Sequence, residues 1–432
     1  ALRGLASQTP INGICECSDF MDEDLNGNCV AGVSSVRYSV AFIGILVINL
    51  ILITFTISLK GMRFFLYRII EDYQELSIIV FINLQFPQQL FRFLSRLYWF
   101  NFTSAAKIFE SMGNGTLFMF SASDVMLSQY QTLSDKFRLM MKSSNFLSNT
   151  FNVFFLFLGI AGLMALLSYI RRKWKEDDQH STKYKIINRM YNMAFYGMAI
   201  NAFYWSLIEI NINTAIQVMN LSVTTVFSVV GLVFCGLMVA FEIVVFAYFA
   251  REYKREALLK YNYRNPLYST FWLYTSDKKF IGKYFWFWQA GKKIVMAFII
   301  VCMANQPHQV ITALAVAQGI WLIICVYAEP YERKYMRLSL YTSESIKMLV
   351  YIALTNFSEK YVEYLPLVPI TDMIYLLIVV SCAFHTFYII MNIVVEWQLY
   401  AHSMRKKCGC EIPKIRSGGY IGGKLRMYPD SI

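Results

Sequence analysis

The stretch YSVAFIGILVINLILITFTISL, from Tyr38 to Leu59, runs for 22 residues without a charged side chain. An α-helix rises about 1.5 Å per residue and the hydrocarbon core of a bilayer is about 30 Å thick, so about 20 apolar residues cross it. This stretch is therefore predicted to be a membrane-spanning helix. Shortly before it lies a polar segment, Gly13 to Val30, that holds three cysteines.

The composition of the whole chain agrees with a membrane protein. Hydrophobic residues make up 57% of the 432 positions, charged residues make up 16%, and the mean hydropathy is +0.43. Soluble domains carry about 25% charged residues. A chain with so few charges cannot cover a soluble fold with polar surface, so its net charge of +12 is not taken as a sign of nucleic-acid binding.

Further apolar runs predict an all-α, polytopic bundle of about nine spans. Six runs contain no Asp, Glu, Lys or Arg, whereas three weaker runs are short, hold a proline or adjoin charges. Because nine is odd, the two termini are expected on opposite sides. The six runs are Tyr38–Leu59, Phe146–Ile170, Met190–Ile208, Leu221–Phe241, Val310–Ala328 and Met373–Val395, and the three are Leu76–Leu90, Ile294–Asn305 and Met348–Phe357.

The distribution of basic residues predicts the orientation. With the N-terminus outside, 31 Lys and Arg residues fall on the inner side and seven on the outer side, as the positive-inside rule requires. The glycosylation sequons at Asn101 and Asn114 then lie in an extracellular loop, 101–145. We expect a plasma-membrane protein, with the ciliary membrane as one candidate, an extracellular N-terminus and a cytoplasmic C-terminus.

The N-terminal segment, 1–35, is predicted to be extracellular and disulfide-rich. Cys15, Cys17 and Cys29 are closely spaced in a polar stretch on the oxidising side, where disulfides are expected. Because three is odd and the chain begins at Ala1, we expect an EGF-like remnant of a longer cysteine-rich ectodomain. The alternative is one bridge and a free thiol.

Residues 36–397 form the expected transmembrane domain, and 398–432 form a basic cytoplasmic tail. Cys408 and Cys410 follow the basic run Arg405–Lys407, a setting that suits palmitoylation and contact with anionic lipids. Two reduced thiols beside an ordinary stop-transfer cluster explain the same residues.

Polar residues within the predicted spans are the candidate functional residues, because charge in hydrocarbon is costly. Glu242 is expected to form an ion pair with Lys292 or Lys293, and this pair is expected to fix the register of two neighbouring helices. His385 is either a pH sensor or a packed histidine, and the two arginines either line a pore or reach the headgroups. The candidates are Arg92, Arg96, Glu209, Glu242, Lys292, Gln318 and His385.

No catalytic, metal or cofactor site is predicted. The motifs HExxH and GxSxG and the Walker A motif are absent from the sequence, and the four histidines are far apart in it. The chain is therefore not expected to be an enzyme.

Four aromatic stretches carry a resemblance to a known group of proteins. The chain resembles the TRP-like, polycystin-like membrane module at the C-terminus of large cysteine-rich protist surface proteins and, more distantly, the fungal TRP-like channels. The likeness covers most of Val36–Trp397. The stretches are LQFPQQLFRFLSRLYWFNF (Leu84–Phe102), YNYRNPLYSTFWLY (Tyr261–Tyr274), YFWFWQAGKKIV (Tyr284–Val295) and YAEPYERKYMRLSLYTSE (Tyr327–Glu344).

This resemblance implies an ion channel or channel subunit that couples a cysteine-rich ectodomain to cation permeation. The alternative is a non-conducting anchor or scaffold for a large surface protein, which the lack of a Gly-rich filter pattern between the last spans favours. A lipid-scrambling groove is a third option. The expected partners are membrane lipids and other membrane or surface proteins, with an oligomer left open and no nucleic acid.

Overall fold

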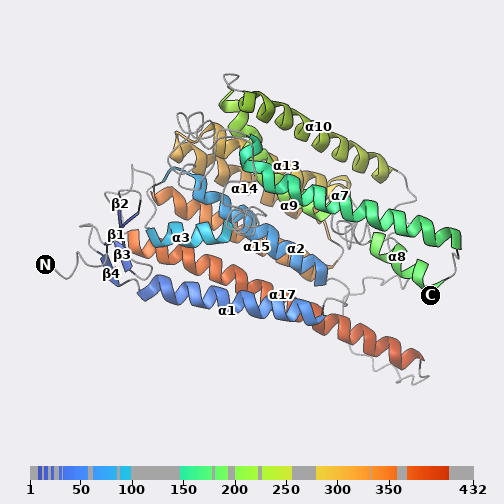
Figure 1. Cartoon of the computed structure of the whole chain (residues 1–432). Helices are drawn as coiled ribbons and strands as arrows, with labels where there is room; N and C mark the ends of the chain where they lie inside the picture. Colours follow the sequence, from blue (N-terminus) through green and yellow to red (C-terminus); the bar gives the residue numbers. More distant parts are fainter. Residues whose placement is uncertain are drawn as a thin grey trace.

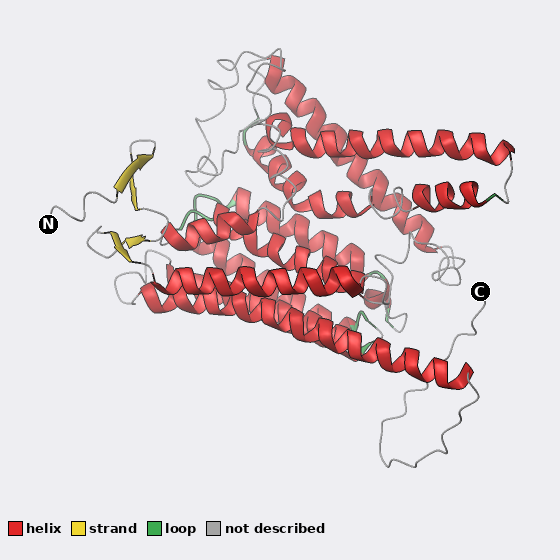
Figure 2. Ribbon diagram, turned by 60° about the horizontal axis from the view of Figure 1, so that its bottom comes forward, coloured by secondary structure: helices red, strands yellow, loops and turns green. Residues whose placement is uncertain are grey.

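The apolar runs form long helices that lie side by side with roughly aligned axes (Figures 1 and 2), which confirms the predicted helical bundle. The computed structural model describes residues 8–11, 14–17, 21–23, 29–31, 33–56, 62–84, 88–98, 146–177, 181–192, 200–221, 226–254, 279–331, 333–357 and 367–407. In chain order the α-helices are α1 (Val33–Thr56), α2 (Met62–Ser77), α3 (Gln88–Leu97), α7 (Phe146–Asp177), α8 (Thr182–Asn192), α9 (Ile200–Met219), α10 (Val226–Lys254), α12 (Phe280–Lys283), α13 (Phe285–Cys302), α14 (Pro307–Ala328), α15 (Lys334–Leu354) and α17 (Leu367–Lys407). Two 3₁₀ turns, η2 (Ile78–Phe81) and η5 (Thr355–Phe357), follow α2 and α15.

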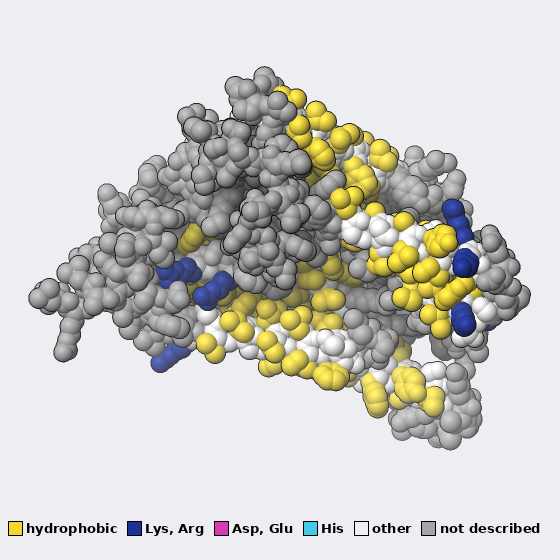
Figure 3. All heavy atoms as spheres, viewed as in Figure 1, with side chains coloured by type: hydrophobic (Ala, Val, Ile, Leu, Met, Phe, Trp, Pro, Cys, Tyr) yellow, Lys and Arg dark blue, Asp and Glu magenta, His cyan; other side chains and the backbone are white. Residues whose placement is uncertain are grey.

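Five of the described helices are long and apolar enough to cross a membrane. They expose large apolar side chains, such as Phe55 (84% exposed) on α1 and Ile323 (69%) on α14. Hydrocarbon accepts such a surface and water does not, so these helices indicate a membrane protein. Figure 3 shows apolar side chains over the middle of the molecule and Lys and Arg toward its ends. The five segments are Arg37–Thr56, Ser228–Ala247, Phe285–Cys302, Pro307–Ala328 and Pro369–Met404.

One of the predicted spans, Leu76–Leu90, is wrong as a single helix. Over this run α2 ends at Ser77, η2 follows, and a new helix, α3, begins at Gln88. The apolar run therefore covers the end of one helix and the start of the next. The predicted span Met190–Ile208 includes residues 193–199, which lie outside the described part, so it stays a prediction.

Two other helices begin well before the predicted spans. α13 begins at Phe285 instead of Ile294 and includes Lys292 and Lys293, and α15 begins at Lys334 instead of Met348. The prediction stopped each span at a charged residue. These helices continue through such residues because many of the charges are paired inside the bundle, as described below.

The centre of the bundle is formed by α2 and α9. Every side chain from Glu71 to Ile82 and from Ser206 to Gln217 is buried. Around this centre α1 packs on α17, α13 on α9, α15 on both α14 and α17, and α7 on α8, α9 and α10. The buried polar side chains of α2 and α9 are thus enclosed by the surrounding helices.

The N-terminal segment forms two small antiparallel sheets. β1 (Gln8–Ile11) pairs with β2 (Ile14–Cys17), and β3 (Met21–Glu23) pairs with β4 (Cys29–Ala31). The three predicted disulfide cysteines lie on β2 and β4, but their side chains are outside the described part. The strands and the last turns of α17 lie at opposite ends of the bundle (Figure 1). α17 ends at Lys407, so the predicted domain boundary at 397 falls inside a helix.

Two leucine-sized side chains on α14 test this arrangement. Leu314 is fully buried, whereas Ile323, nine residues on, is 69% exposed. Leu314→Ala should lower the free energy of unfolding by about 2–5 kcal/mol because it leaves a cavity. Ile323→Ala should change it by no more than about 0.5 kcal/mol. Denaturant titration of the purified protein in detergent measures both, and equal losses would contradict the assigned lipid-facing side of α14.

Candidate functional site

One face of α2 carries four charged side chains. Arg68, Glu71, Asp72 and Glu75 are spaced i, i+3, i+4 and i+7, which places them on one side of the helix. Arg68 Nη1 lies 3.2 Å from Glu71 Oε2, and Arg68 Nη2 lies 3.1 Å from Asp72 Oδ1. All four side chains are at least 94% buried. Because one arginine cannot neutralise three buried carboxylates, further cations must come from neighbouring helices.

Those cations come from α13. Lys292 Nζ lies 2.7 Å from Glu75 Oε2 and 2.8 Å from an oxygen of Glu344, which belongs to α15. Lys293 Nζ lies 3.4 Å from Glu71 Oε1 and 3.8 Å from the centre of the Tyr204 ring, while the Tyr204 hydroxyl donates to Glu71 Oε1 at 2.6 Å. The two adjacent lysines thus reach different carboxylates of α2.

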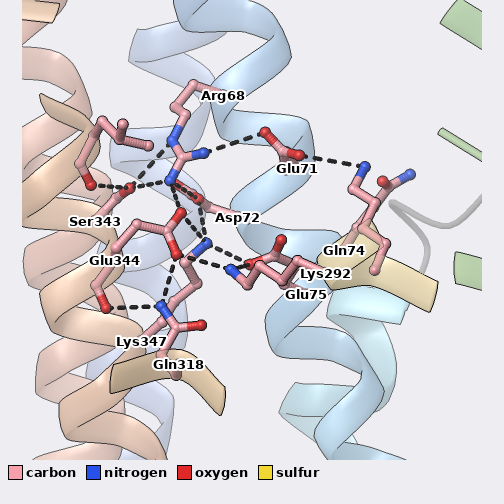
Figure 4. Close-up of polar contacts among 12 residues, drawn as sticks. Arg68, Glu71, Asp72, Gln74, Glu75, Lys292, Gln318, Ser343, Glu344 and Lys347 are labelled. Carbon is pink, nitrogen blue, oxygen red and sulfur yellow. Dashed lines mark hydrogen bonds and ion pairs between the residues drawn. The ribbon is translucent and has the colours of Figure 1, made fainter. Parts of the chain in front are cut away.

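α15 supplies both a carboxylate and a cation (Figure 4). Glu344 forms an ion pair with Arg68 and lies 2.7 Å from Nζ of Lys347 on the next turn. Lys347 Nζ also lies 3.0 Å from Asp72 Oδ1 and forms an ion pair with Glu75. From α14, the Gln318 amide donates to Glu344 Oε2 at 2.6 Å.

The ion network, as we call this set, is balanced between four acids and four bases. Lys292 and Gln318 lie near the middle of the apolar segments Phe285–Cys302 and Pro307–Ala328, so the network lies at about mid-depth of a membrane. Isolated charges are expensive there, and mutual pairing offsets that cost. The acids are Glu71, Asp72, Glu75 and Glu344, and the bases are Arg68, Lys292, Lys293 and Lys347.

His385 adds a titratable group to the balanced set. Its Nε2 lies 3.0 Å from Asp72 Oδ2, and its side chain on α17 is 2% exposed. The Tyr73 ring meets the imidazole edge-on, with centroids 6.5 Å apart. His385 is therefore packed against the ion network.

A polar stripe on α9 leads from the ion network toward the end of the bundle that holds α3. It consists of Ser206, Glu209, Asn213 and Gln217, all at most 2% exposed. Asn213 Nδ2 donates to Glu209 Oε1 at 3.1 Å, and the Tyr98 hydroxyl, just after α3, donates to the other oxygen of Glu209. Gln217 accepts the backbone N–H of Phe146 at 2.8 Å.

Polar contacts also continue on the opposite side of the ion network. The Tyr335 hydroxyl on α15 donates to Asn392 on α17 at 2.7 Å, and Arg333 contacts both Tyr335 and Glu396. Asn392 is seven residues beyond His385, or about 10 Å along the helix. Polar side chains therefore occur at several depths between the bundle's two ends.

Beyond the apolar segment of α14, Glu329 lies at the surface. Its backbone has a φ of 46°, the left-handed conformation that ends the helix. The hydrogen bond and charge of Lys279, together with the charge of Arg337, lower the pKa of the Glu329 carboxyl. Glu329, Lys279 and Arg337 thus form ion pairs between the same residue types as the ion network, but these pairs lie at the surface.

The predicted pair between Glu242 and a lysine of α13 is wrong. Glu242 accepts from the Asn211 amide on α9 at 3.1 and 3.4 Å, whereas Lys292 and Lys293 contact the carboxylates of α2 and α15. Sequence order placed the two helices next to each other. The two helices do touch, through Phe246 and Trp286, but Lys292 and Lys293 meet three carboxylates of α2 and α15 instead: Glu71, Glu75 and Glu344.

The structure brings only some of the predicted residues together. Lys292, Gln318 and His385 belong to or border the ion network, whereas Glu209 and Glu242 lie on two other helices. Arg92 and Arg96 are on the short helix α3 at the strand-bearing end, where Arg96 is exposed. Asn101, Asn114, Cys408 and Cys410 lie outside the described residues.

Sequence reasoning missed the α2 part of the ion network. The predicted topology places Arg68 in a segment on the inner side between two spans, and Glu71, Asp72 and Glu75 are not among the predicted candidates. The i, i+3, i+4, i+7 spacing in RIIEDYQE was the available signal, since it puts all four charges on one face. Comparison with family models, curated proteins and solved structures finds no match to the chain.

Glu344 is the residue whose loss should disturb the ion network most. Glu344→Gln leaves Arg68, Lys292 and Lys347 with one carboxylate fewer, and we expect the free energy of unfolding to fall by about 3–5 kcal/mol. Glu329→Gln is the matched control, because that carboxylate is also paired but is 40% exposed, and it should change stability little. Equal thermal midpoints for the two variants in detergent would argue against the ion network.

A double-mutant cycle separates the observed pairing from the predicted one. Lys293→Met and Glu71→Gln should show a coupling energy of about 0.5–3 kcal/mol, since the two groups are in contact. Lys293→Met and Glu242→Gln should be additive within about 0.5 kcal/mol. The reverse result in denaturant titrations would restore the pair between Glu242 and α13.

Proposed function

We propose that the chain is a TRP-like cation channel, or a subunit of one, with nine spans, an extracellular N-terminus and a cytoplasmic C-terminus. The proposal rests on the ion network at mid-depth of an apolar bundle. Charged side chains inside membrane proteins usually mark paths for ions or protons. Coupling of the cysteine-rich N-terminal segment to permeation belongs to the same proposal.

The distribution of polar side chains supports a path through the bundle interior. The stripe on α9 extends the ion network toward one end, and the contacts of Arg333, Tyr335 and Asn392 extend it toward the other. Carboxylates from α2, α9 and α15 occur along this line. Because rings of carboxylates favour cations, the proposed permeant ion is a cation.

The ion network also suggests how a closed path is held shut. The ammonium groups of Lys292 and Lys347 occupy the space between Glu75 and Glu344, where a mobile cation would otherwise bind. Movement of α13 or α15 would separate the lysines from these carboxylates. Opening in this proposal therefore exchanges a tethered cation for a mobile one.

The ion network favours a channel over a plain membrane anchor. Replacing a buried ion pair with apolar side chains is often neutral or stabilising, so anchoring alone does not require eight buried charges. The opposite placement of the strands and the end of α17 in Figure 1 supports an odd number of crossings. The basic residues expected on the inner side support the same orientation.

Cation flux into liposomes tests the proposal. The purified full chain, reconstituted in liposomes, should conduct K⁺ or Na⁺ above the level of empty liposomes. Asn213→Leu removes the amide that donates to Glu209 and places an apolar side chain in the α9 stripe. We expect flux to fall about tenfold or more, the effect of about 1.4 kcal/mol on a barrier.

The lipid-facing variant Ile323→Ala serves as the control and should conduct like the wild type. Circular dichroism and gel filtration must show that each variant keeps its helical content and size. A folded, reconstituted wild-type chain that carries no cations under a membrane potential of either sign would favour the non-conducting anchor.

A further inference from the structure

Glu242 on α10 differs from the carboxylates of the ion network in what surrounds it. Its side chain is 6% exposed. Both of its oxygens face the Asn211 amide, at 3.1 and 3.4 Å, and no Lys, Arg or His of the described residues lies within ion-pair distance of it. One neutral amide is thus its partner, where Glu75 and Glu344 each meet two or more cations.

The position of Glu242 makes this lack of a counter-charge costly. It lies within the apolar segment Ser228–Ala247, five residues or about 7.5 Å from the nearer end. The next two residues, Ile243 and Val244, are 63% and 64% exposed and point into the lipid region. The surroundings therefore disfavour an ionised carboxylate strongly.

Charged and titratable groups of the helices around Glu242 are engaged elsewhere or lie farther away. On α9, Tyr204 donates to Glu71, and Glu209 meets Tyr98 and Asn213. On α7, Phe157 marks the level of Glu242, since its ring lies 6.2 Å from the Phe241 ring, and the first basic residue of α7 comes about 20 Å later. The remaining described groups are Tyr169, Arg171, Arg172 and Lys173 on α7, Lys292 and Lys293 on α13, and Cys235 on α10 itself.

We propose that Glu242 is a proton-binding site: in the folded protein at neutral pH it is a carboxylic acid that contacts the Asn211 amide. Its ligand is the proton, which it releases at alkaline pH. Release leaves a carboxylate beside lipid with a single neutral donor, so ionisation weakens the packing of α10 against α9. This proposal stands whether or not the chain conducts ions.

Infrared spectroscopy of the full chain in lipid detects the proton directly. The difference spectrum of wild type minus Glu242→Gln at neutral pH should show the C=O stretching band of a protonated carboxylic acid. The control difference, wild type minus Glu329→Gln, should show carboxylate bands, because that residue is exposed and paired with Lys279. Carboxylate bands in the Glu242 difference would overturn the proposal.

The pH dependence of stability provides a second readout. A folded state that binds a proton more tightly than the unfolded state loses stability as the pH rises. The thermal midpoint of the wild type should therefore fall between about pH 5 and alkaline pH by more than that of Glu242→Gln, which has no proton to release. Parallel midpoints for the two proteins over this range, or an acid band that persists in alkaline buffer, would refute binding and release at this site.

Discussion

Mutual neutralisation of four carboxylates and four cations at mid-depth is the constraint on which the rest of the bundle depends. Each of these charges alone would be costly in a low-dielectric interior, and each is offset only while its partners remain in place. Since Glu75 of α2 must meet Lys292 of α13 and Lys347 of α15, the axial positions of three helices are set together. Apolar packing alone would tolerate small shifts along the helix axes far more easily.

The surroundings of the ion network follow from the same constraint. α2 has to be enclosed, and the helices that enclose it expose leucine, isoleucine, valine and phenylalanine to the outside. Polar groups that are not charged serve as links between layers, as Gln318 does between α14 and α15 and Asn49 does between α1 and the Cys382 carbonyl of α17. Charges in the interior and large apolar side chains on the outside are the reverse of the usual arrangement in a soluble protein.

Two kinds of buried acid therefore coexist in one bundle. Glu344 is surrounded by guanidinium and ammonium groups and remains charged because these cations offset its burial. Glu242 has an amide instead, and lipid-facing side chains lie beside it. The proton rather than a counter-ion then provides neutrality. The same residue type thus has two roles, which its neighbours decide.

The sequence by itself determined the helical class and the apolar helices, and only the tertiary structure decided the charged centre. The uncharged runs Tyr38–Leu59 and Val310–Ala328 match α1 and α14 closely because hydropathy along one helix reports the demand of lipid directly. Hydropathy does not predict the bounds of α2, α13 and α15. In these helices a charge is stable because its partners, up to 276 residues away in the chain, neutralise it. Glu242, Lys292 and His385 were recognisable as candidates, but their partners depend on which helix faces pack together, and a local pattern carries no information about that.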